Sequence, residues 1–557
     1  MTYQRRWLRF AVGIAVISAS MLANADDPAP GSIDPNNWPQ YHRTSNAWRY
    51  SPLAQITTAN VHRLKVAWVH QPGDITNGLQ ATPIVKDGIL YYPGPFSNVF
   101  ALNAATGETL WRYRPVIDDA AYEIQLSGVS RGVSIGHGLV YIGTSDGRFI
   151  ALDQATGLEK WSKQITDFRG CNGCNFTSPP QLAGEVLFSG STGGDFATAG
   201  KIYAVNALTG EALWTFDIIK DDRESWPEGV AQYGGGGAWM PGTYDEASDT
   251  IFIGTGNASA DFYGDNRSGD NKYTATFLAL EPRTGALKWH HQEIPHDIWD
   301  FDSPYEALIV TRDGKDHVVH LSKSGFVFIY AKQTGRLRKV WQFAENLNFA
   351  EGVDLETGKL INRVHIPAGQ EGTQCPSWLG ARSWNHGAYN PTTELWYTNA
   401  VEMCNRVIPA EVEFEKIPFG QAALGASKIQ SVAPQGKKVS ARLDALDPLS
   451  GERRWSIEYE MPGLGNVLTT GGNLVFNSDA VGAFIAYNAE SGERLWHFPM
   501  GAGSRGGTIS YAVAGKQYIV ATAGFSGFVP SIFAEAFPKM RDIPNGGLVI
   551  AFTLDEI

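Results

Sequence analysis

The stretch ALNAATGETLW, residues 101–111, contains the pattern on which most of the chain is built. An apolar segment, Ala101–Leu102–Asn103, leads into the pair Thr106–Gly107, and Trp111 follows. The glycine can adopt the positive φ that a tight turn requires, and a tryptophan at the start of the next strand can pack on a neighbouring sheet. The stretch therefore predicts two antiparallel strands joined by a Thr-Gly turn.

The same phrase recurs along the chain, with either Thr-Gly or Ser-Gly before the tryptophan. The copies end at Trp68, Trp111, Trp161, Trp214, Trp289, Trp341, Trp455 and Trp496. The copy at Trp341 matches the phrase more loosely, and at Trp68 only the final part of a copy is present. A strand-rich repeat of this length indicates a propeller or solenoid, and a closed ring protects sheet edges better than an open stack. We expect an all-β, eight-bladed β-propeller whose first copy is completed by the C-terminal strands.

The composition limits the kinds of molecule that the protein is expected to bind. The 557 residues are 43% hydrophobic and 18% charged, as in a globular protein. The formal net charge is -12, which argues against nucleic acid, because phosphates require a basic face. An acidic surface instead suits a basic protein partner or a bound cation.

The N-terminus has the pattern of an export signal. Three arginines precede a short apolar run and a small-x-small cleavage site: Arg5, Arg6 and Arg9, then Phe10 to Leu22, then Ala23–Asn24–Ala25. We expect a signal peptide at 1–25, a propeller at 26–557 and a periplasmic mature protein with no membrane span after cleavage. An uncleaved anchor is the alternative.

Four cysteines in an exported chain indicate two disulfides. We expect Cys171 to pair with Cys174, and Cys375 with Cys404. Cys171 and Cys174 form a CxxC motif without the second pair that a zinc site needs, and Asn175 stands where haem attachment requires histidine. No covalently bound haem is therefore expected.

A short acidic run between Pro295 and Pro304 is the first candidate for chemistry. In an extended segment, Asp300 and Asp302 would point to the same side. Two like charges so close would raise one pKa or require a cation. A solvated acidic loop is the alternative, and this run alone does not exclude it.

Taken together, the residues resemble the quinoprotein alcohol dehydrogenases, whose cofactor is pyrroloquinoline quinone (PQQ). The resemblance covers nearly the whole mature chain and rests on the tryptophan repeats and on the phrases Trp38–Pro39, Tyr50–Ser51–Pro52–Leu53, Gly254–Thr255–Gly256–Asn257 and Trp299–Asp300. It implies oxidation of an alcohol to an aldehyde or ketone, with hydride transfer to PQQ.

The resemblance also implies a metal site. Its ligands are Asp195, Asn257 and Asp300, whose side-chain oxygens suit Ca²⁺. Asp302 resembles the additional aspartate of lanthanide-using relatives, although some calcium-using relatives share it. We expect Ca²⁺, with a lanthanide-dependent primary alcohol dehydrogenase as an alternative.

Further residues match the family's cofactor contacts. Trp239 resembles the floor under the quinone, and Lys323 a catalytic cation beside a quinone oxygen. The other expected contacts are Gln80, Arg131, Thr177, Thr192, Gly193, Gly194 and Asn385. Many relatives carry adjacent cysteines in the stretch matching Gln125 to Ser127, which has none here. We hypothesise that Cys171 and Cys174 form a substitute wall.

The resemblance assigns Asp300 as the general base. It implies that electrons leave to a separate cytochrome c or another acceptor. The missing cysteine pair favours a secondary or bulky alcohol, a polyol or a xenobiotic of the trichothecene kind. Chain position makes pocket candidates of Phe301, Trp378, Phe419 and Phe525. A non-catalytic scaffold with the same repeats is the alternative, but it would not need Asp195, Asn257, Asp300 and Lys323 together.

Overall fold

A computed structural model describes residues 33–220 and 222–554. The chain divides into two compact units, Met1–Asp34 and Pro35–Ile557, and the described strands and helices all belong to the second. The expected signal segment, 1–25, lies outside the described residues. Within the described part, the helices are all too short or too polar to cross a membrane.

Within the described residues, eight sheets of four or five strands follow one another along the chain. The first six are β3 (Ile84–Lys86), β4 (Ile89–Gly94), β5 (Asn98–Asn103) and β6 (Thr109–Tyr113); β7 (Ser134–Gly136), β8 (Leu139–Gly143), β9 (Arg148–Asp153) and β10 (Glu159–Gln164); β11 (Gln181–Ala183), β12 (Val186–Gly190), β13 (Lys201–Asn206) and β14 (Ala212–Asp217); β15 (Thr243–Asp245), β16 (Thr250–Gly254), β17 (Thr276–Leu280) and β18 (Leu287–Gln292); β19 (Leu308–Arg312), β20 (Lys315–Leu321), β21 (Phe326–Ala331) and β22 (Leu337–Gln342); and β26 (Ala388–Asn390), β27 (Leu395–Glu402), β30 (Ser440–Leu446) and β31 (Arg453–Tyr459).

The last two sheets draw strands from both ends of the unit. They are β32 (Leu468–Thr470), β33 (Leu474–Ser478), β34 (Ala483–Asn488) and β35 (Arg494–Pro499) with β1 (Tyr50–Ser51), and β36 (Ile509–Val513), β37 (Lys516–Gly524) and β38 (Gly547–Leu554) with β2 (Leu64–His70). Small sheets in the loops contain β23 (Gly352–Val353), β24 (Leu360–Ile361), β25 (Gly372–Gln374), β28 (Cys404–Pro409) and β29 (Ala426–Val432), and one α-helix, α1 (Phe528–Ala536), lies between β37 and β38.

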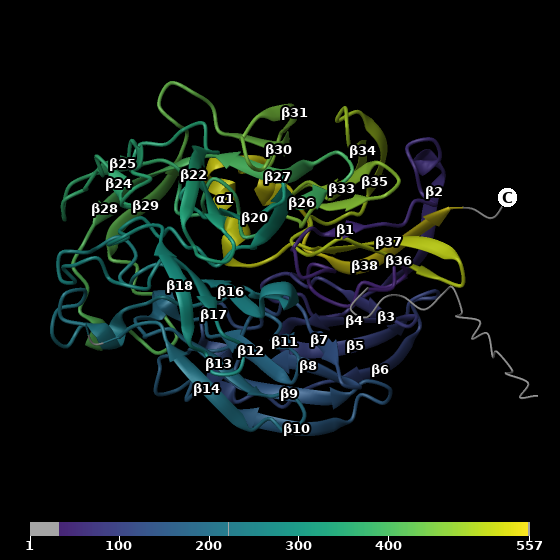
Figure 1. The fold of residues 1–557 in the computed structure, drawn as a ribbon, viewed down its shortest axis with the longest axis horizontal. Coiled ribbons are helices and arrows are strands. Elements are labelled where there is room, and N and C mark those ends of the chain that lie inside the picture. Colours follow the sequence, from purple (N-terminus) through teal and green to yellow (C-terminus); the bar gives the residue numbers. More distant parts are fainter. Residues whose placement is uncertain (1–32, 221, 555–557) are drawn as a thin grey trace, which may run out of the picture. The chain divides into compact units, whose positions relative to one another are not determined.

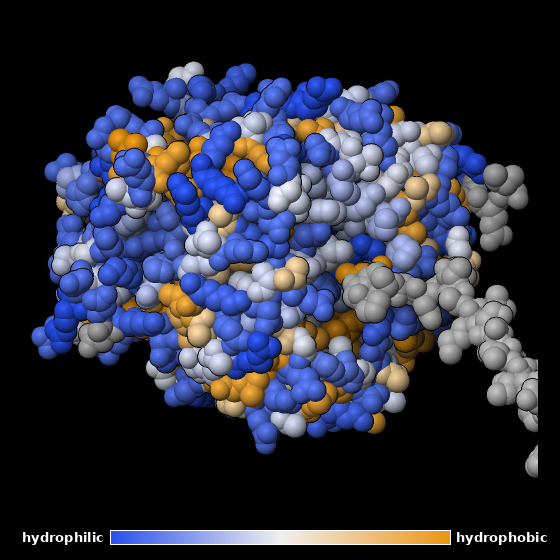
Figure 2. Space-filling view, viewed as in Figure 1, coloured by the Kyte–Doolittle hydropathy of each residue, from blue (hydrophilic) through white to orange (hydrophobic). Residues whose placement is uncertain are grey.

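The sheets are arranged around a centre, as Figure 1 shows. The ring closes within one sheet, where β2 pairs antiparallel with β38 and Trp68 lies opposite Ala551. The predicted completion of the first copy by the C-terminal strands is therefore confirmed, and the eight sheets agree with the expected number of blades. On the face drawn in Figure 2, hydrophilic side chains predominate between separated hydrophobic groups.

Each tryptophan of the repeat fastens one sheet to the next. The indole of Trp111 lies against Gly157 of the following copy and donates from Nε1 to the carbonyl oxygen of Gln154 at 3.2 Å. Equivalent contacts pair Trp68 with Gly107, Trp161 with Gly210, Trp214 with Gly285, Trp289 with Gly335, Trp341 with Gly451 and Trp455 with Gly492. Trp496 instead packs on Phe552 of β38, at 5.1 Å between ring centroids, where the ring closes.

The docking contact makes a stability prediction with a matched control. Gly157 and Gly138 have similar positive φ, +71° and +74°, but an added Cβ would lie 2.6 Å from the Trp111 ring at Gly157 and in open space at Gly138. Gly138→Ala should lose about 1–2 kcal/mol through backbone strain alone. Gly157→Ala adds overpacking of about 1–3 kcal/mol. Denaturant unfolding of both variants measures the difference; equal losses would mean that the tryptophan contact carries no stability.

Candidate active site at the hub

A cavity of about 170 Å³ lies at the hub, and most of the predicted site residues line it. It is lined by Gln80, Arg131, Thr177, Thr192, Gly193, Gly194, Asp195, Trp239, Asn257, Asp300, Asp302 and Lys323. The innermost strands explain this convergence: Gln80, Thr177 and Trp239 each stand four residues before one of them, β3, β11 and β15. Blades that repeat the same geometry thus place equivalent positions at the centre.

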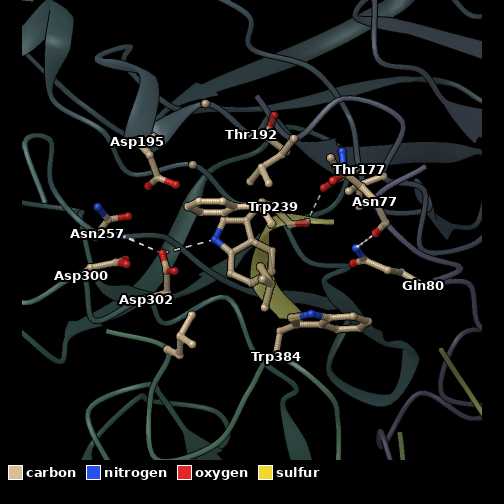
Figure 3. Close-up of a pocket in the computed structure, with 18 of the residues that line it drawn as sticks. Asn77, Gln80, Thr177, Thr192, Asp195, Trp239, Asn257, Asp300, Asp302 and Trp384 are labelled. Carbon is tan, nitrogen blue, oxygen red and sulfur yellow. Dashed lines mark hydrogen bonds between the residues drawn. The ribbon is translucent and has the colours of Figure 1, made fainter. Parts of the chain in front are cut away.

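One end of the cavity is acidic. Figure 3 shows Asp195, Asn257, Asp300 and Asp302 facing one another on one side of Trp239. Lys323 bridges two of them, with Nζ 2.8 Å from Oδ1 of Asp300 and 2.6 Å from Oδ2 of Asp302. Burial alone would lower the pKa of Lys323, but Asp300 and Asp302 raise it well above its usual value. Lys323 is therefore a buried cation held by two carboxylates.

The backbone around Asp300 is clamped by a neighbouring carboxylate. Asp297, fully buried, accepts from the N–H of Trp299 at 3.0 Å and from that of Phe301 at 2.8 Å. Asp300 between them adopts a left-handed φ of 58°, which an aspartate tolerates better than most residues. Burial raises the pKa of Asp300 well above its usual range, Asp302 and Asp195 add to this, and Lys323 opposes it.

Asp302 is fixed by three donors. Its Oδ1 accepts from the indole Nε1 of Trp239 at 3.2 Å and from the backbone N–H of Asn257 at 3.0 Å, while Oδ2 contacts Lys323.

Asp195 is held differently. It lies in the short turn Gly194–Phe196 after Gly193, whose φ of 97° requires glycine. Burial, followed by Asp302, raises the pKa of Asp195 to about 6.

The other end of the cavity is basic. Arg131 and Arg505 line it, both are buried, and neither forms an ion pair with a carboxylate of the described residues. The Arg131 guanidinium lies between two indoles, 5.0 Å from Trp239 and 4.9 Å from Trp384. Burial lowers the pKa of Arg131 to about 10 and that of Arg505, which also faces Arg131, to about 9. Two buried cations without counterions indicate a site for an anionic ligand.

Three predicted contacts do not line the cavity. Asn385 donates from Nδ2 to the carbonyl oxygen of Arg505 at 3.2 Å and so buttresses the basic end. Cys171 and Cys174 form the predicted disulfide but lie outside the lining, with Cys174 behind Gly193. The second predicted disulfide, Cys375–Cys404, is also present. The stretch from Gln125 to Ser127, which carries adjacent cysteines in many relatives, contributes Leu126 to the cavity lining. An aliphatic side chain therefore takes the place of the cysteine pair.

Only one of the four substrate-pocket candidates chosen by chain position lines the cavity. Trp378 does so, whereas Phe301, Phe419 and Phe525 do not. Residues that sequence reasoning missed include Asn77, Tyr305, Trp384, Arg505 and the clamp Asp297. Two of them carried a usable signal, since Trp384 and Arg505 stand four residues before the innermost strands β26 and β36, the same offset as Trp239 before β15.

The donor set indicates what the cavity can hold. Arg131 retains a buried Nε without a partner in the described structure, a vacant donor suited to a ligand carboxylate. At the acidic end, no three His, Cys, Asp or Glu side chains of the described part are arranged to hold a metal by themselves. Lys323 contacts Oδ1 of Asp300. The atoms left to bind a hard cation are therefore Oδ2 of Asp300, the Asp195 carboxylate and the Asn257 amide oxygen. These residues fit a flat, anionic cofactor and a metal ion side by side.

Comparisons with known proteins agree with this geometry. The family described as "PQQ: Glucose/ethanol/alcohol dehydrogenase, beta-propeller domain" matches residues 38–357 and 407–519. The quinoprotein alcohol dehydrogenase PedH of Pseudomonas putida is 32% identical over 100% of this chain and 98% of its own. The structure of the quinohemoprotein alcohol dehydrogenase ADHIIG of P. putida HK5 superposes with a TM-score of 0.85 at 31% identity, over 94% of this chain and 80% of that one.

A second solved structure bears on the metal. A europium-containing methanol dehydrogenase superposes with a TM-score of 0.86 at 25% identity, covering 94% of this chain and 98% of that chain. The family's cofactor is PQQ together with a metal ion, calcium or a lanthanide. The ring of tryptophan-docked sheets, the cavity with its acidic and basic ends, and the full-length similarity place this chain in the family of PQQ-dependent quinoprotein alcohol dehydrogenases.

Proposed function

We propose that this quinoprotein oxidises bulky, largely apolar alcohols, with Asp300 as the general base. The observation that carries the proposal is that the buried ion pair of Asp300 and Lys323 shares its cavity with a wall of apolar side chains. A substrate hydroxyl directed at Asp300 would leave the rest of the molecule against that wall. A non-catalytic scaffold would leave this buried charge without a purpose.

The chain offers distinct residues for each part of the cofactor. Arg131 and Arg505 would hold cofactor carboxylates, with Thr177 adding a hydroxyl, and Trp239 would form the flat floor. Asp195, Asn257 and Asp300 would hold the metal ion, and Asp302 would stiffen the site through its three donors. PQQ, when bound, supplies a two-electron acceptor, and the metal supplies Lewis acidity.

Asp300 is suited to accept the proton of a substrate hydroxyl. Its raised pKa, set by burial, brings it toward the range in which a base works efficiently. The clamp by Asp297 fixes the direction of its side chain, and Lys323 holds Oδ1 at 2.8 Å. Lys323 keeps a positive charge beside the reacting atoms, where it would stabilise developing negative charge.

The apolar wall is assembled from segments far apart in the sequence. Ile124 and Leu126 come from the loop before β7, Trp378 and Leu379 from the loop tied by the Cys375–Cys404 disulfide, and Phe528, Val529 and Ile532 from α1. Residues 378–379 and 528–532 lie outside the ranges that the family model matches. Part of the wall therefore lies in segments that the family model does not match, and the apolar character of the wall disfavours polyols.

Cysteine chemistry and net charge support a proposed localisation and a proposed electron acceptor. We place the mature protein in the periplasm, with a separate carrier, a cytochrome c or similar acceptor, receiving the electrons. Both cysteines of the CxxC motif are paired in a disulfide, so they are not available for haem attachment. The formal charge of -12 would favour a basic carrier through electrostatic steering.

Asp300→Asn tests the assignment of the base. The amide cannot accept the substrate proton, so turnover should fall by a factor of about 10³ or more while PQQ binding is retained. Dye-linked activity and tryptophan quenching by added PQQ provide the two readouts. Asp302→Asn is the companion variant, because the carboxylate oxygens of Asp302 are already occupied by its three donors. Full turnover in Asp300→Asn would refute the role of Asp300 as the general base.

Arg505→Met tests the basic end. Removing one of two unpaired buried cations should weaken PQQ binding about tenfold or more, the loss expected for a charged hydrogen bond. Titration of the metal-loaded protein with PQQ, followed by fluorescence, measures it. The exposed Arg494→Met is the control and should bind as wild type. Binding within twofold of wild type in Arg505→Met would remove this residue from the cofactor site.

Trp378→Ala tests the substrate class. It should lower kcat/KM for large apolar secondary alcohols about tenfold, a typical cost of losing pocket contacts, and change that for ethanol far less. Phe419→Ala is the control, since Phe419 does not line the cavity. A wild-type preference for glycerol or sorbitol over apolar alcohols of similar size would contradict the proposal.

A further inference from the structure

A fourth carboxylate lies next to the metal site without lining its cavity. Asp261 is 1% exposed, and it stands behind Asn257. Its Oδ1 accepts a hydrogen bond from Asn257 Nδ2 at 2.8 Å, and its Oδ2 has no hydrogen-bond partner in the described structure. A buried carboxylate with one unpaired oxygen is costly and requires a compensating charge.

The hydrogen bond to Asp261 determines which way the Asn257 side chain points. Because Nδ2 donates to Asp261 and to the carbonyl oxygen of Ala258, Oδ1 is directed elsewhere. Figure 3 shows that oxygen turned toward Asp195 and Asp302, with the nitrogen turned away. The amide of an asparagine can otherwise rotate, so Asp261 fixes Oδ1 as the cavity-facing atom.

Asp261 has a buried cation nearby, Arg267, but forms no hydrogen bond with it. Its neighbour Arg267 donates to Asn271 and to backbone oxygens of Ala260 and Asp297 rather than to the Asp261 carboxylate. Asp261 contacts Asn257 at the acidic end, and Lys323 is the one ammonium group that offsets the carboxylates in the described cavity.

We propose that Asp261 is a positioning residue for the metal ion: it orients Asn257 and, as a fourth carboxylate, favours a cation of higher charge. The inference rests on the proposed metal site. Asp195, Asp261, Asp300 and Asp302 with Lys323 leave an excess of three negative charges when ionised, which a trivalent cation neutralises and a divalent one does not. The contribution of one carboxylate to the free energy of cation binding is proportional to the charge of the cation. For a trivalent and a divalent ion, these contributions are in the ratio of about three to two.

Two substitutions separate the two roles. Asp261→Asn removes the charge but keeps an oxygen that can accept from Asn257, whereas Asp261→Ala removes both. Asp265→Asn is the control, with the same chemical change at an exposed position of the same loop. The probes are Tb³⁺ and Ca²⁺, each added alone to metal-stripped full-length protein in the presence of PQQ.

Affinity is read from tryptophan-sensitised Tb³⁺ emission and from Ca²⁺ competition, and independently from the metal-induced rise in Tm, which remains measurable in a destabilised variant. Asp261→Asn should weaken Tb³⁺ by roughly thirtyfold and Ca²⁺ by roughly tenfold. Asp261→Ala should weaken both by about a further tenfold, as losses of such supporting partners do. Asp265→Asn should match wild type.

The outcomes are distinguishable. Equal losses of Tb³⁺ and Ca²⁺ in Asp261→Asn would overturn the charge role, and identical behaviour of Asp261→Asn and Asp261→Ala would overturn the orienting role. Wild-type protein that binds neither ion would instead remove the proposed metal site itself. Wild-type binding with both variants unchanged would defeat only the inference about Asp261.

Discussion

The stacking of the repeat tryptophans other than Trp496 on the glycine of the next copy is the contact on which the architecture depends. It brings an indole against a backbone that no side chain covers, and the accompanying N–H to carbonyl hydrogen bond fixes its orientation. Because the contact recurs from sheet to sheet, neighbouring sheets keep similar relative positions. The segments that enter the innermost strands then meet at one place, and side chains distant in sequence become neighbours there.

At that place the chain separates charge. Buried arginines without counterions gather at one end of the cavity, and carboxylates around Lys323 gather at the other, with Trp239 between them. Trp239 is bound to both ends, through its ring to Arg131 and through Nε1 to Asp302. A ligand with acidic groups at one edge and a metal at the other is complementary to this arrangement.

Much of this arrangement could be predicted from the sequence, for two different reasons. The repeat phrase is local, so Thr106–Gly107 and Trp111, with the copies that follow, predicted the sheets and their order directly. Asp195, Asn257 and Asp300 had no local signal of convergence, and only resemblance to a known family indicated that they meet. Residues whose role depends on three-dimensional support escaped both routes: Asp297 acts through backbone N–H groups, and Asp261 through the amide of Asn257. The aromatic candidates Phe301, Phe419 and Phe525 were wrong as cavity-lining residues because chain position alone does not distinguish a pocket wall from a core.

The position of α1 in the chain links the pocket to the closure of the ring. The helix that supplies Phe528 and Ile532 to the wall is inserted between β37 and β38, and β38 is the strand that pairs with β2. Both ends of the inserted segment are therefore anchored in the sheet that joins the two ends of the propeller, so loosening of that sheet would also displace the apolar wall.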